Sequence, residues 1–229
     1  HGTSIGGVII DGGNFDWTGK PDQQPNFNQP DNSYHGAVWG QLVPEALGAP
    51  IAFAVRARVV LLRDLGAALS PTNAFHLIQG LETLPLRFRE HQANAAKVAD
   101  YLSDHDAVEK VIYPSLFEGD EKARVDSYLT KGHGALVGIE IKGGIEAGRR
   151  FIDNLKLLYH VANIGDARSL AIHPASTTHS QLSAEEQLAA GVTAGYIRLS
   201  IGIEHSDDII ADITQALDAA TSHSPKAVA

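Results

Sequence analysis

The sequence contains no cysteine and no methionine, and each absence excludes something. Without cysteine there can be no disulfide bond, no thiolate nucleophile and no cysteine-ligated zinc site. A cysteine-free chain also suits a reducing compartment, so we expect a cytoplasmic protein. Without methionine the sequence lacks even an initiator residue, and we expect the gene to begin upstream of His1.

The sequence also has little positive charge and no long apolar run. Its 18 lysine and arginine residues stand against 27 aspartate and glutamate residues, a formal net charge of −9. Basic runs interleaved with aromatic residues do not occur, so we expect no nucleic-acid partner. No apolar stretch approaches the roughly 18 residues needed to cross a bilayer, so we expect no membrane partner. The composition, 44% hydrophobic and 20% charged, is that of an ordinary globular protein.

The most informative segment runs from Tyr196 to Glu204. Isoleucine or leucine occupies every second position after Tyr196, which is the alternation of a strand with one buried face. The opposite face carries Tyr196, Arg198, Ser200 and Gly202. A lone arginine on such a face has a fork of donors suited to a carboxylate, so Arg198 is a candidate ligand-binding residue. The alternative, a surface ion pair on an exposed sheet face, fits the spacing equally well.

The start of the chain combines a glycine-rich segment with a long loop. Residues 7–11 are predicted to form a short buried strand, whose parallel neighbours are not in the sequence. Residues 13–50 are rich in Gly, Pro, Asn, Asp and Gln, and they are too many for a plain connection. We expect either a functional loop or an ordered excursion with a short helix of its own.

Helical periodicity follows this loop. One helix is predicted over 53–66, and a second begins at Ser70 and Pro71, a favoured pair for an N-cap and the first helical position. Pro85 is expected to break or kink this second helix. We therefore predict a domain boundary there, with one domain over 1–84 and a second over 85–229.

The second half alternates strands and helices, which makes the class α/β with mixed strands. Strands are expected over 108–113, 134–142, 169–174 and 196–204. Ser183 and Glu186 form a capping-box pattern at the start of a short helix. Ser206 is the predicted N-cap of the last helix.

Eleven histidines raise the question of a metal site. The best pair, His173 and His179, would lie about 20 Å apart on an extended chain at about 3.3 Å per residue. The sequence holds no His-Glu-x-x-His motif, Walker loop, nucleophile elbow or Gly-x-Gly-x-x-Gly fingerprint. We therefore expect no metal site.

The run over 161–170 is of a different kind. It gathers Asn, Asp, Arg and Ser around one glycine between two apolar segments. Polar residues at this density in a loop between strands predict a recognition loop. A plain turn with a contact between Asp166 and Arg168 is the alternative.

Several motifs together carry a resemblance to a known family. The two longest are HVANIGDARSLAIHPASTTHSQLS (160–183) and GYIRLSIGIEHSDDIIADITQAL (195–217), and the opening HGTSIGGVIIDGGNFDW and the runs at 30–36 and 80–87 follow in order. They closely resemble the pyridoxal-phosphate enzymes of cysteine and methionine metabolism, over essentially the whole chain. The resemblance implies a fold-type I pyridoxal-phosphate transferase. The chain would be the C-terminal part of its large domain plus its smaller α/β C-terminal domain.

The resemblance also implies roles for particular residues. Arg198 would bind the α-carboxylate of the substrate, and Asn163 would help to orient that arginine. Ser169 would lie at the same wall of the pocket. His173 and His179 fall inside a family motif, where we expect structural or supporting roles. The loop over 13–40 would line the pocket mouth or a neighbouring subunit, although packing is the preferred role for its aromatic residues.

The resemblance implies as well that the catalytic lysine is missing. In this family, the lysine that forms the Schiff base with the cofactor precedes the sequence matching His1-Gly-Thr-Ser, and no lysine of this chain lies in that motif. The aromatic that stacks on the cofactor, the aspartate that pairs with its nitrogen and the phosphate loop would also lie upstream. We therefore expect pyridoxal 5'-phosphate to be bound mainly by a missing N-terminal half, and the chain alone to be inactive.

The motifs are most like those of the members that act on O-acetyl-L-homoserine. The implied reaction is a γ-replacement, in which sulfide or a thiol displaces acetate and gives L-homocysteine for methionine biosynthesis. The implied partners are the amino-acid substrate, the N-terminal half and further copies in a homotetramer. Two alternatives stay open: a relative of cystathionine γ-synthase or γ-lyase, and a catalytically silent C-terminal module.

Overall fold

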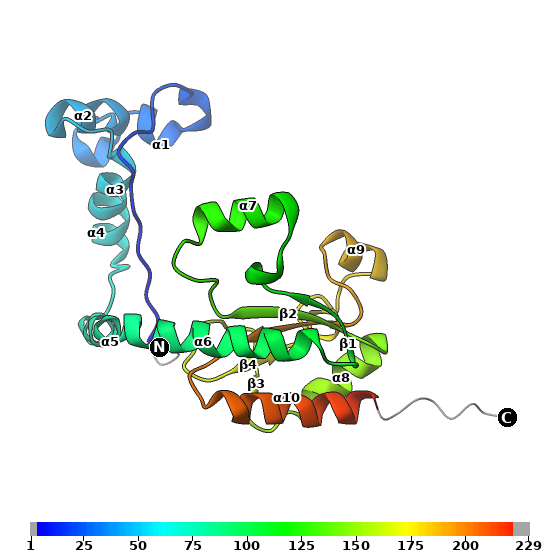
Figure 1. Ribbon diagram of the computed structural model, residues 1–229. Coiled ribbons are helices and arrows are strands. Elements are labelled where there is room, and N and C mark those ends of the chain that lie inside the picture. Colours follow the sequence, from blue (N-terminus) through cyan, green and yellow to red (C-terminus); the bar gives the residue numbers. More distant parts are fainter. Residues whose placement is uncertain (1–3, 222–229) are drawn as a thin grey trace. The chain divides into compact units, whose positions relative to one another are not determined.

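The computed structural model describes residues 4–221, which divide into two compact units, residues 4–79 and residues 80–221 (Figure 1). The predicted domain boundary between residues 84 and 85 stays a prediction. Among the described residues, no helix has both the length and the apolar character that a membrane span requires.

The first unit consists of short helices and loops. They are η1 (Pro21–Gln23), α1 (Pro25–Asn28), η2 (Asn32–Tyr34), α2 (Trp39–Leu47), α3 (Ala52–Arg56), the π-helical η3 (Ala57–Leu62), α4 (Arg63–Leu65) and most of α5 (Pro71–Glu82), whose last residues belong to the second unit. Together α3, η3 and α4 confirm the helix predicted over 53–66, and the stretch ends at Gly66, whose φ of 68° a residue with a side chain would rarely adopt. Helix α5 begins at the predicted Pro71.

The loop over 13–50 folds around its own aromatic residues. The ring of Trp17 stacks on Phe53, with centroids 5.7 Å apart, and tilts against Phe27 at 4.3 Å. Trp39 is buried in the same cluster and donates its indole N–H to Asp31 at 3.0 Å. The preferred reading of these aromatics as packing residues is therefore confirmed.

The strand predicted over 7–11 does not form. Residues 4–11 have no regular secondary structure, and Val8, Ile9 and Ile10 are 83%, 65% and 86% exposed. A strand needs a neighbour for its backbone hydrogen bonds, and no segment within 4–221 pairs with this one. The prediction was wrong for this chain by itself, because an apolar run becomes a buried strand only where partner strands are available.

The second unit is built on a five-stranded sheet with the order β1-β2-β5-β4-β3. Its strands are β1 (Val108–Ile112), β2 (Leu136–Ile141), β3 (Tyr159–His160), β4 (Leu170–Ile172) and β5 (Tyr196–Ser200). The first four in spatial order are antiparallel neighbours, and β3 runs parallel to β4. The predicted strands and the mixed sheet are confirmed, while β3, with only two residues, was missed.

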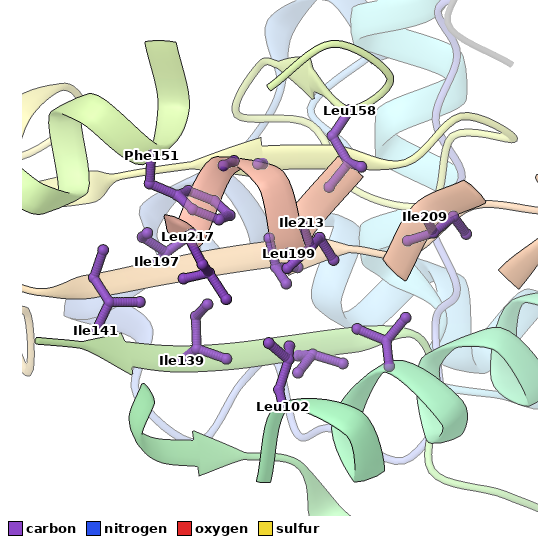
Figure 2. Close-up of a cluster of buried hydrophobic side chains, with 14 of the residues drawn as sticks. Leu102, Ile139, Ile141, Phe151, Leu158, Ile197, Leu199, Ile209, Ile213 and Leu217 are labelled. Carbon is purple, nitrogen blue, oxygen red and sulfur yellow. The ribbon is translucent and has the colours of Figure 1, made fainter. Parts of the chain in front are cut away.

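Three helices pack on the apolar face of this sheet: α6 (Leu84–Ser103), α8 (Gly144–Asn154) and α10 (Ser206–Thr221). Figure 2 shows Leu102, Phe151 and Leu217 from these helices gathered around Ile139 and Ile197 of the strands, and all five side chains are almost fully buried. The other elements are η4 (Pro114–Leu116), α7 (Gly119–Tyr128), η5 (Pro174–Ser176) and α9 (Ala184–Ala189). This core is the scaffold on which the opposite face of the sheet presents its side chains.

The helix boundaries test three predictions from single residues. Pro85 lies in the first turn of α6, just after the break at Thr83, so the predicted break is confirmed. The capping box at the start of α9 is present as predicted. Helix α10, however, begins at Ser206 itself, whose hydroxyl accepts a bond from Lys97 Nζ at 3.1 Å. The N-cap prediction was therefore wrong by one residue, and His205 Nδ1 binds the backbone N–H of Asp207 instead.

Candidate functional site

Arg198 lies in a row of residues that crosses the sheet on the face opposite the three packed helices. The strand register places Arg198 opposite Gly138 of β2 and Ile172 of β4, and Gly138 opposite Ile112 of β1. A Cβ atom on Gly138 would lie 2.9 Å from the ring of Tyr196, so the glycine makes room for that ring. The row thus presents a cation and a phenol beside two isoleucines.

The guanidinium of Arg198 is held on one side only. Its Nη2 donates to the carbonyl oxygens of Ala162 at 2.6 Å and Asn163 at 3.4 Å. Within residues 4–221 it forms no ion pair with any carboxylate. The alternative of a surface ion pair is therefore not what the structure shows. Within the described residues, Nε and Nη1 have no hydrogen-bond partner, so each can donate a hydrogen bond to a carboxylate of a ligand.

Arg198 lines a cavity of about 370 Å³. Ile112 and Ile172 line its apolar part, and Thr178, His179 and Tyr196 add polar groups. A concave site of this size, mostly apolar and with a few placed polar groups, suits a small molecule with one carboxylate.

Two polar residues of this cavity were not predicted as site residues. Tyr196 lies two residues before Arg198 on the same strand face, a position that the alternation alone could have indicated. Thr178 comes from the loop after η5, and only the fold brings it to the cavity. His179, for which we expected a structural or supporting role, also lines the cavity, and its Nδ1 lies 3.0 Å from Thr178 Oγ1.

Tyr196 is held in its neutral form. Burial raises the pKa of its phenol, nearby Arg198 lowers it and Glu140 raises it further, and the net shift is upward. Glu140 is itself occupied, because it accepts a hydrogen bond from Thr193 Oγ1 at 2.5 Å. A neutral phenol in a cavity can donate a hydrogen bond to an anionic ligand.

Asn163 meets Arg198 through its backbone and not through its amide. Its carbonyl is the more distant of the two acceptors on Nη2, and its side chain is exposed. Its predicted role, to orient the arginine, is one that this carbonyl can perform. That role stays a prediction.

Ser169 is fully buried and its hydroxyl is occupied. Ser169 Oγ donates to Glu204 Oε2 at 2.9 Å and accepts the backbone N–H of Gly202 at 2.8 Å. No part of Ser169 lines the cavity of Arg198. Its only hydroxyl hydrogen is already donated, so Ser169 has no free donor for a ligand here, and its predicted place in the pocket wall stays a prediction.

His173 supports the wall of the cavity from behind. Its side chain is fully buried, Nε2 lies 2.9 Å from the carbonyl of Ala194, and Nδ1 lies 2.7 Å from Ser176 Oγ. Burial lowers the pKa of the imidazole, so the folded protein holds His173 neutral. The structural reading of His173 is confirmed.

The described residues fit a carboxylate better than a cofactor or a metal. Among residues 4–221, no group of three or more His, Cys, Asp or Glu side chains could hold a metal ion. The cavity lining contains no lysine, so these residues do not fit the covalent attachment of pyridoxal phosphate. What the arrangement can do is grip and orient a small carboxylate.

Comparison with known proteins agrees with this chemistry. The chain is 54% identical to an O-acetyl-L-homoserine sulfhydrylase of Leptospira meyeri, over 95% of the chain and 50% of the relative. It is 42% identical to a homocysteine/cysteine synthase of Saccharomyces cerevisiae, over 95% of the chain and 50% of that protein. The chain thus spans about half the length of the curated relatives it matches.

A solved structure and a family pattern extend the agreement. The structure comes from Campylobacter jejuni, is described as an O-acetylhomoserine (thiol)-lyase and carries N'-pyridoxyl-lysine-5'-monophosphate. It matches with a TM-score of 0.75 and 46% identity, over 86% of this chain and 45% of that one. Residues 1–218 match the family described as Cys/Met metabolism PLP-dependent enzyme. The chain therefore belongs to the pyridoxal-phosphate-dependent enzymes of cysteine and methionine metabolism.

Proposed function

We propose that this chain supplies the carboxylate-binding part of a γ-replacement enzyme. The complete enzyme would convert O-acetyl-L-homoserine and sulfide, or a small thiol, to L-homocysteine and acetate in methionine biosynthesis. The observation that carries the proposal is Arg198, which lines a small cavity and has two guanidinium nitrogens without a hydrogen-bond partner among residues 4–221. The relatives named as sulfhydrylases and homocysteine synthases support the choice of substrate.

Different residues of the cavity hold such a substrate through different contacts. Arg198 grips the α-carboxylate, and Ala162 and Asn163 fix the guanidinium from the other side. Tyr196, held neutral, donates to an anionic oxygen. Holding the substrate rigidly at reaction distance lowers the barrier through orientation. Pyridoxal phosphate, when bound, supplies the electron sink for chemistry at the substrate carbons.

The rest of the enzyme is part of the same proposal. An N-terminal half would supply most of the cofactor site and the lysine, and residues 1–84 would complete that large domain, followed by a C-terminal domain over 85–229. Residues 13–40 would line the mouth of the pocket or contact a neighbouring subunit. The whole would assemble as a homotetramer in the cytoplasm. The half-length match to the relatives supports a missing portion of this size.

One observation favours a second, more limited function for the chain by itself. The cavity that binds the carboxylate contains no lysine. A polypeptide limited to these 229 residues would therefore bind small carboxylates without turning them over. Absence of an absorbance band near that of bound pyridoxal phosphate would support this module, while a band would contradict it.

The proposal predicts a large loss of activity in Arg198→Ala. The chain would be joined behind the N-terminal half of the Leptospira meyeri relative, and homocysteine formation would be followed with varied O-acetyl-L-homoserine. Removing the charge partner of the carboxylate should lower kcat/KM by about 100-fold, mainly through a higher KM. Arg124→Ala, on the surface of α7 with a side chain 65% exposed, is the matched control.

The outcomes of this experiment separate the alternatives. Equal kcat/KM for Arg198→Ala and Arg124→Ala would contradict the assignment of the carboxylate site. Activity with cysteine in place of sulfide would identify a cystathionine γ-synthase-type relative. Release of a keto acid without any thiol would identify a γ-lyase-type relative.

A further inference from the structure

Residues of β5 and of the stretch that follows it hold the loop that touches Arg198. These residues run from Arg198 to Glu204, and the loop comprises residues 161–169, between β3 and β4. Arg198 binds two carbonyls of the loop, and Ser200 Oγ accepts the backbone N–H of Gly165 at 3.0 Å. Alternate side chains of an extended segment share one face, so these contacts follow from strand geometry.

Glu204 makes the charge-assisted contacts of this series. Its Oε1 accepts the backbone N–H of Ser169 at 2.6 Å, and its Oε2 accepts the hydroxyl of Ser169 at 2.9 Å. Beside it, the N–H of Ile203 donates to the carbonyl of Ala167 at 2.9 Å. Hydrogen bonds to an ionised acceptor are roughly twice as strong as neutral ones. The C-terminal end of the loop is thereby tied to the segment that follows β5.

Helix α6 fixes the backbone of Glu204 in turn. Asn94 Nδ2 donates to the carbonyl of Glu204 at 2.8 Å and to that of Gly202 at 3.2 Å. His91 Nδ1 lies 2.6 Å from the carbonyl of Ile201. Asn94 and His91 are buried in the core. The carboxylate of Glu204 therefore projects from a backbone that a long helix holds in place.

We propose that Glu204 is a positioning residue of the carboxylate site. Its carboxylate fixes residues 161–169, so that the carbonyls of Ala162 and Asn163 stay against Nη2 of Arg198 and leave Nε and Nη1 for the ligand. Without this tie the guanidinium regains rotamer freedom, which a ligand must remove again on binding. The identity of the ligand rests on the proposed function, whereas the link between Glu204 and Arg198 does not.

The test uses the full 229-residue chain and three variants: Glu204→Gln, Glu204→Ala and the control Asp207→Asn, whose side chain is 83% exposed. Amide exchange is measured by NMR at Ser169 and Gly165, together with exchange of the Arg198 Nη2 hydrogens, which bind the loop carbonyls. O-acetyl-L-homoserine and, separately, acetate are titrated in. Amides of Ile139 and Leu199 in the core report whether each variant is folded.

We expect the Ser169 amide to exchange about tenfold faster in Glu204→Gln and faster still in Glu204→Ala, since a hydrogen bond to a charge is lost. The Arg198 Nη2 hydrogens should exchange faster as well, and Kd for O-acetyl-L-homoserine should rise by about threefold to tenfold. Asp207→Asn should match the wild type in all three measurements. Where Glu204→Ala fails to fold, Glu204→Gln decides the question.

Two results would overturn the proposal. One is faster exchange at Ser169 with an unchanged Arg198 signal and an unchanged Kd, because Glu204 would then stabilise only the loop. The other is no change at Ser169. If the wild-type chain binds neither O-acetyl-L-homoserine nor acetate, the proposed function of the cavity fails, and the exchange of the Arg198 Nη2 hydrogens still decides the role of Glu204.

Discussion

At the scale of single residues, the second unit distinguishes polar groups that hold the backbone from those left for a ligand. Ser169 and His173 are fully buried, and each makes two or more hydrogen bonds inside the protein. Arg198 is half-buried, and in the described part of the chain two of its guanidinium nitrogens have no hydrogen-bond partner. A buried polar group without a partner is destabilising, so satisfied burial indicates structure, and partial burial with spare donors indicates binding.

His173 should make the stability of the protein fall as the pH falls. Burial lowers the pKa of its imidazole in the folded state, whereas the unfolded chain takes up the proton near pH 6.5. Below that pH the unfolded state therefore binds more protons, and the free energy of unfolding decreases by up to about 1.4 kcal/mol per pH unit. Urea unfolding at pH 7.5 and 5.5 measures this loss.

His173→Gln isolates the contribution of this histidine. An amide can still donate to the carbonyl of Ala194 but does not titrate. The difference in free energy of unfolding between the wild type and His173→Gln should therefore shrink by about 1 kcal/mol between pH 7.5 and 5.5. His76→Gln, at an exposed residue of α5, is the control, and its difference from the wild type in the free energy of unfolding should change little between the two pH values. A constant difference for His173→Gln would contradict the neutral, buried imidazole.

At the scale of secondary structure, local sequence patterns predicted those strands and helix starts that depend on neighbouring residues in the sequence. Alternating isoleucine and leucine marked β5, and the pair Ser183 and Glu186 marked the start of α9. The strand over 7–11 failed because its partners are not a property of its own sequence. The strand pattern predicted Arg198 as a binding residue, but it did not predict the role of Glu204. The hydrogen bond between Glu204 and Ser169 joins residues that only the fold brings together.

Helix α8 packs closely against His173, and Gly148 lies at the point of contact. A Cβ atom at Gly148 would lie 2.4 Å from Nε2 of His173, an atom already bonded to Ala194. Alanine gains up to about 1 kcal/mol over glycine from helix propensity, but overpacking costs about 1–3 kcal/mol. We therefore expect Gly148→Ala to lower the free energy of unfolding by about 1 kcal/mol, measured in urea.

A double variant tests this explanation. In His173→Ala the ring is gone, so adding Gly148→Ala should then be neutral or stabilising. Additive losses in the double variant would mean that the clash with His173 is not the cause. A more stable single variant would mean that α8 moves to accept the methyl group.

At the scale of the whole molecule, the two units differ in how much apolar surface they bury. The second unit has a continuous core that joins a sheet and three helices, whereas the fully buried cluster of the first unit comprises Trp39, Val43 and Ala52. Several large apolar residues of the first unit are exposed, among them Val8, Ile9 and Ile10. With relatives about twice as long, this is the surface that we propose the remaining half would cover.

Residues 8–10 form an exposed apolar run, and a lysine at position 9 should have opposite effects in the 229-residue chain and in a complete enzyme. Three adjacent β-branched residues without a strand partner form a template for pairing between chains, so the 229-residue chain should self-associate. Ile9→Lys should weaken that association, measured by sedimentation velocity over a concentration series. Leu188→Lys, at a residue 62% exposed on α9, is the control and should leave the association unchanged.

In the chain joined to the N-terminal half of the Leptospira meyeri relative, the same Ile9→Lys substitution should destabilise the protein. If the added half covers residues 8–10, the lysine must be buried without a partner, and the free energy of unfolding should fall by about 3 kcal/mol or more. Leu188→Lys should remain near neutral there, because the surface of α9 lies on the second unit. An Ile9→Lys variant that is harmless in the joined protein would mean that this apolar run is exposed in the complete enzyme and has another partner.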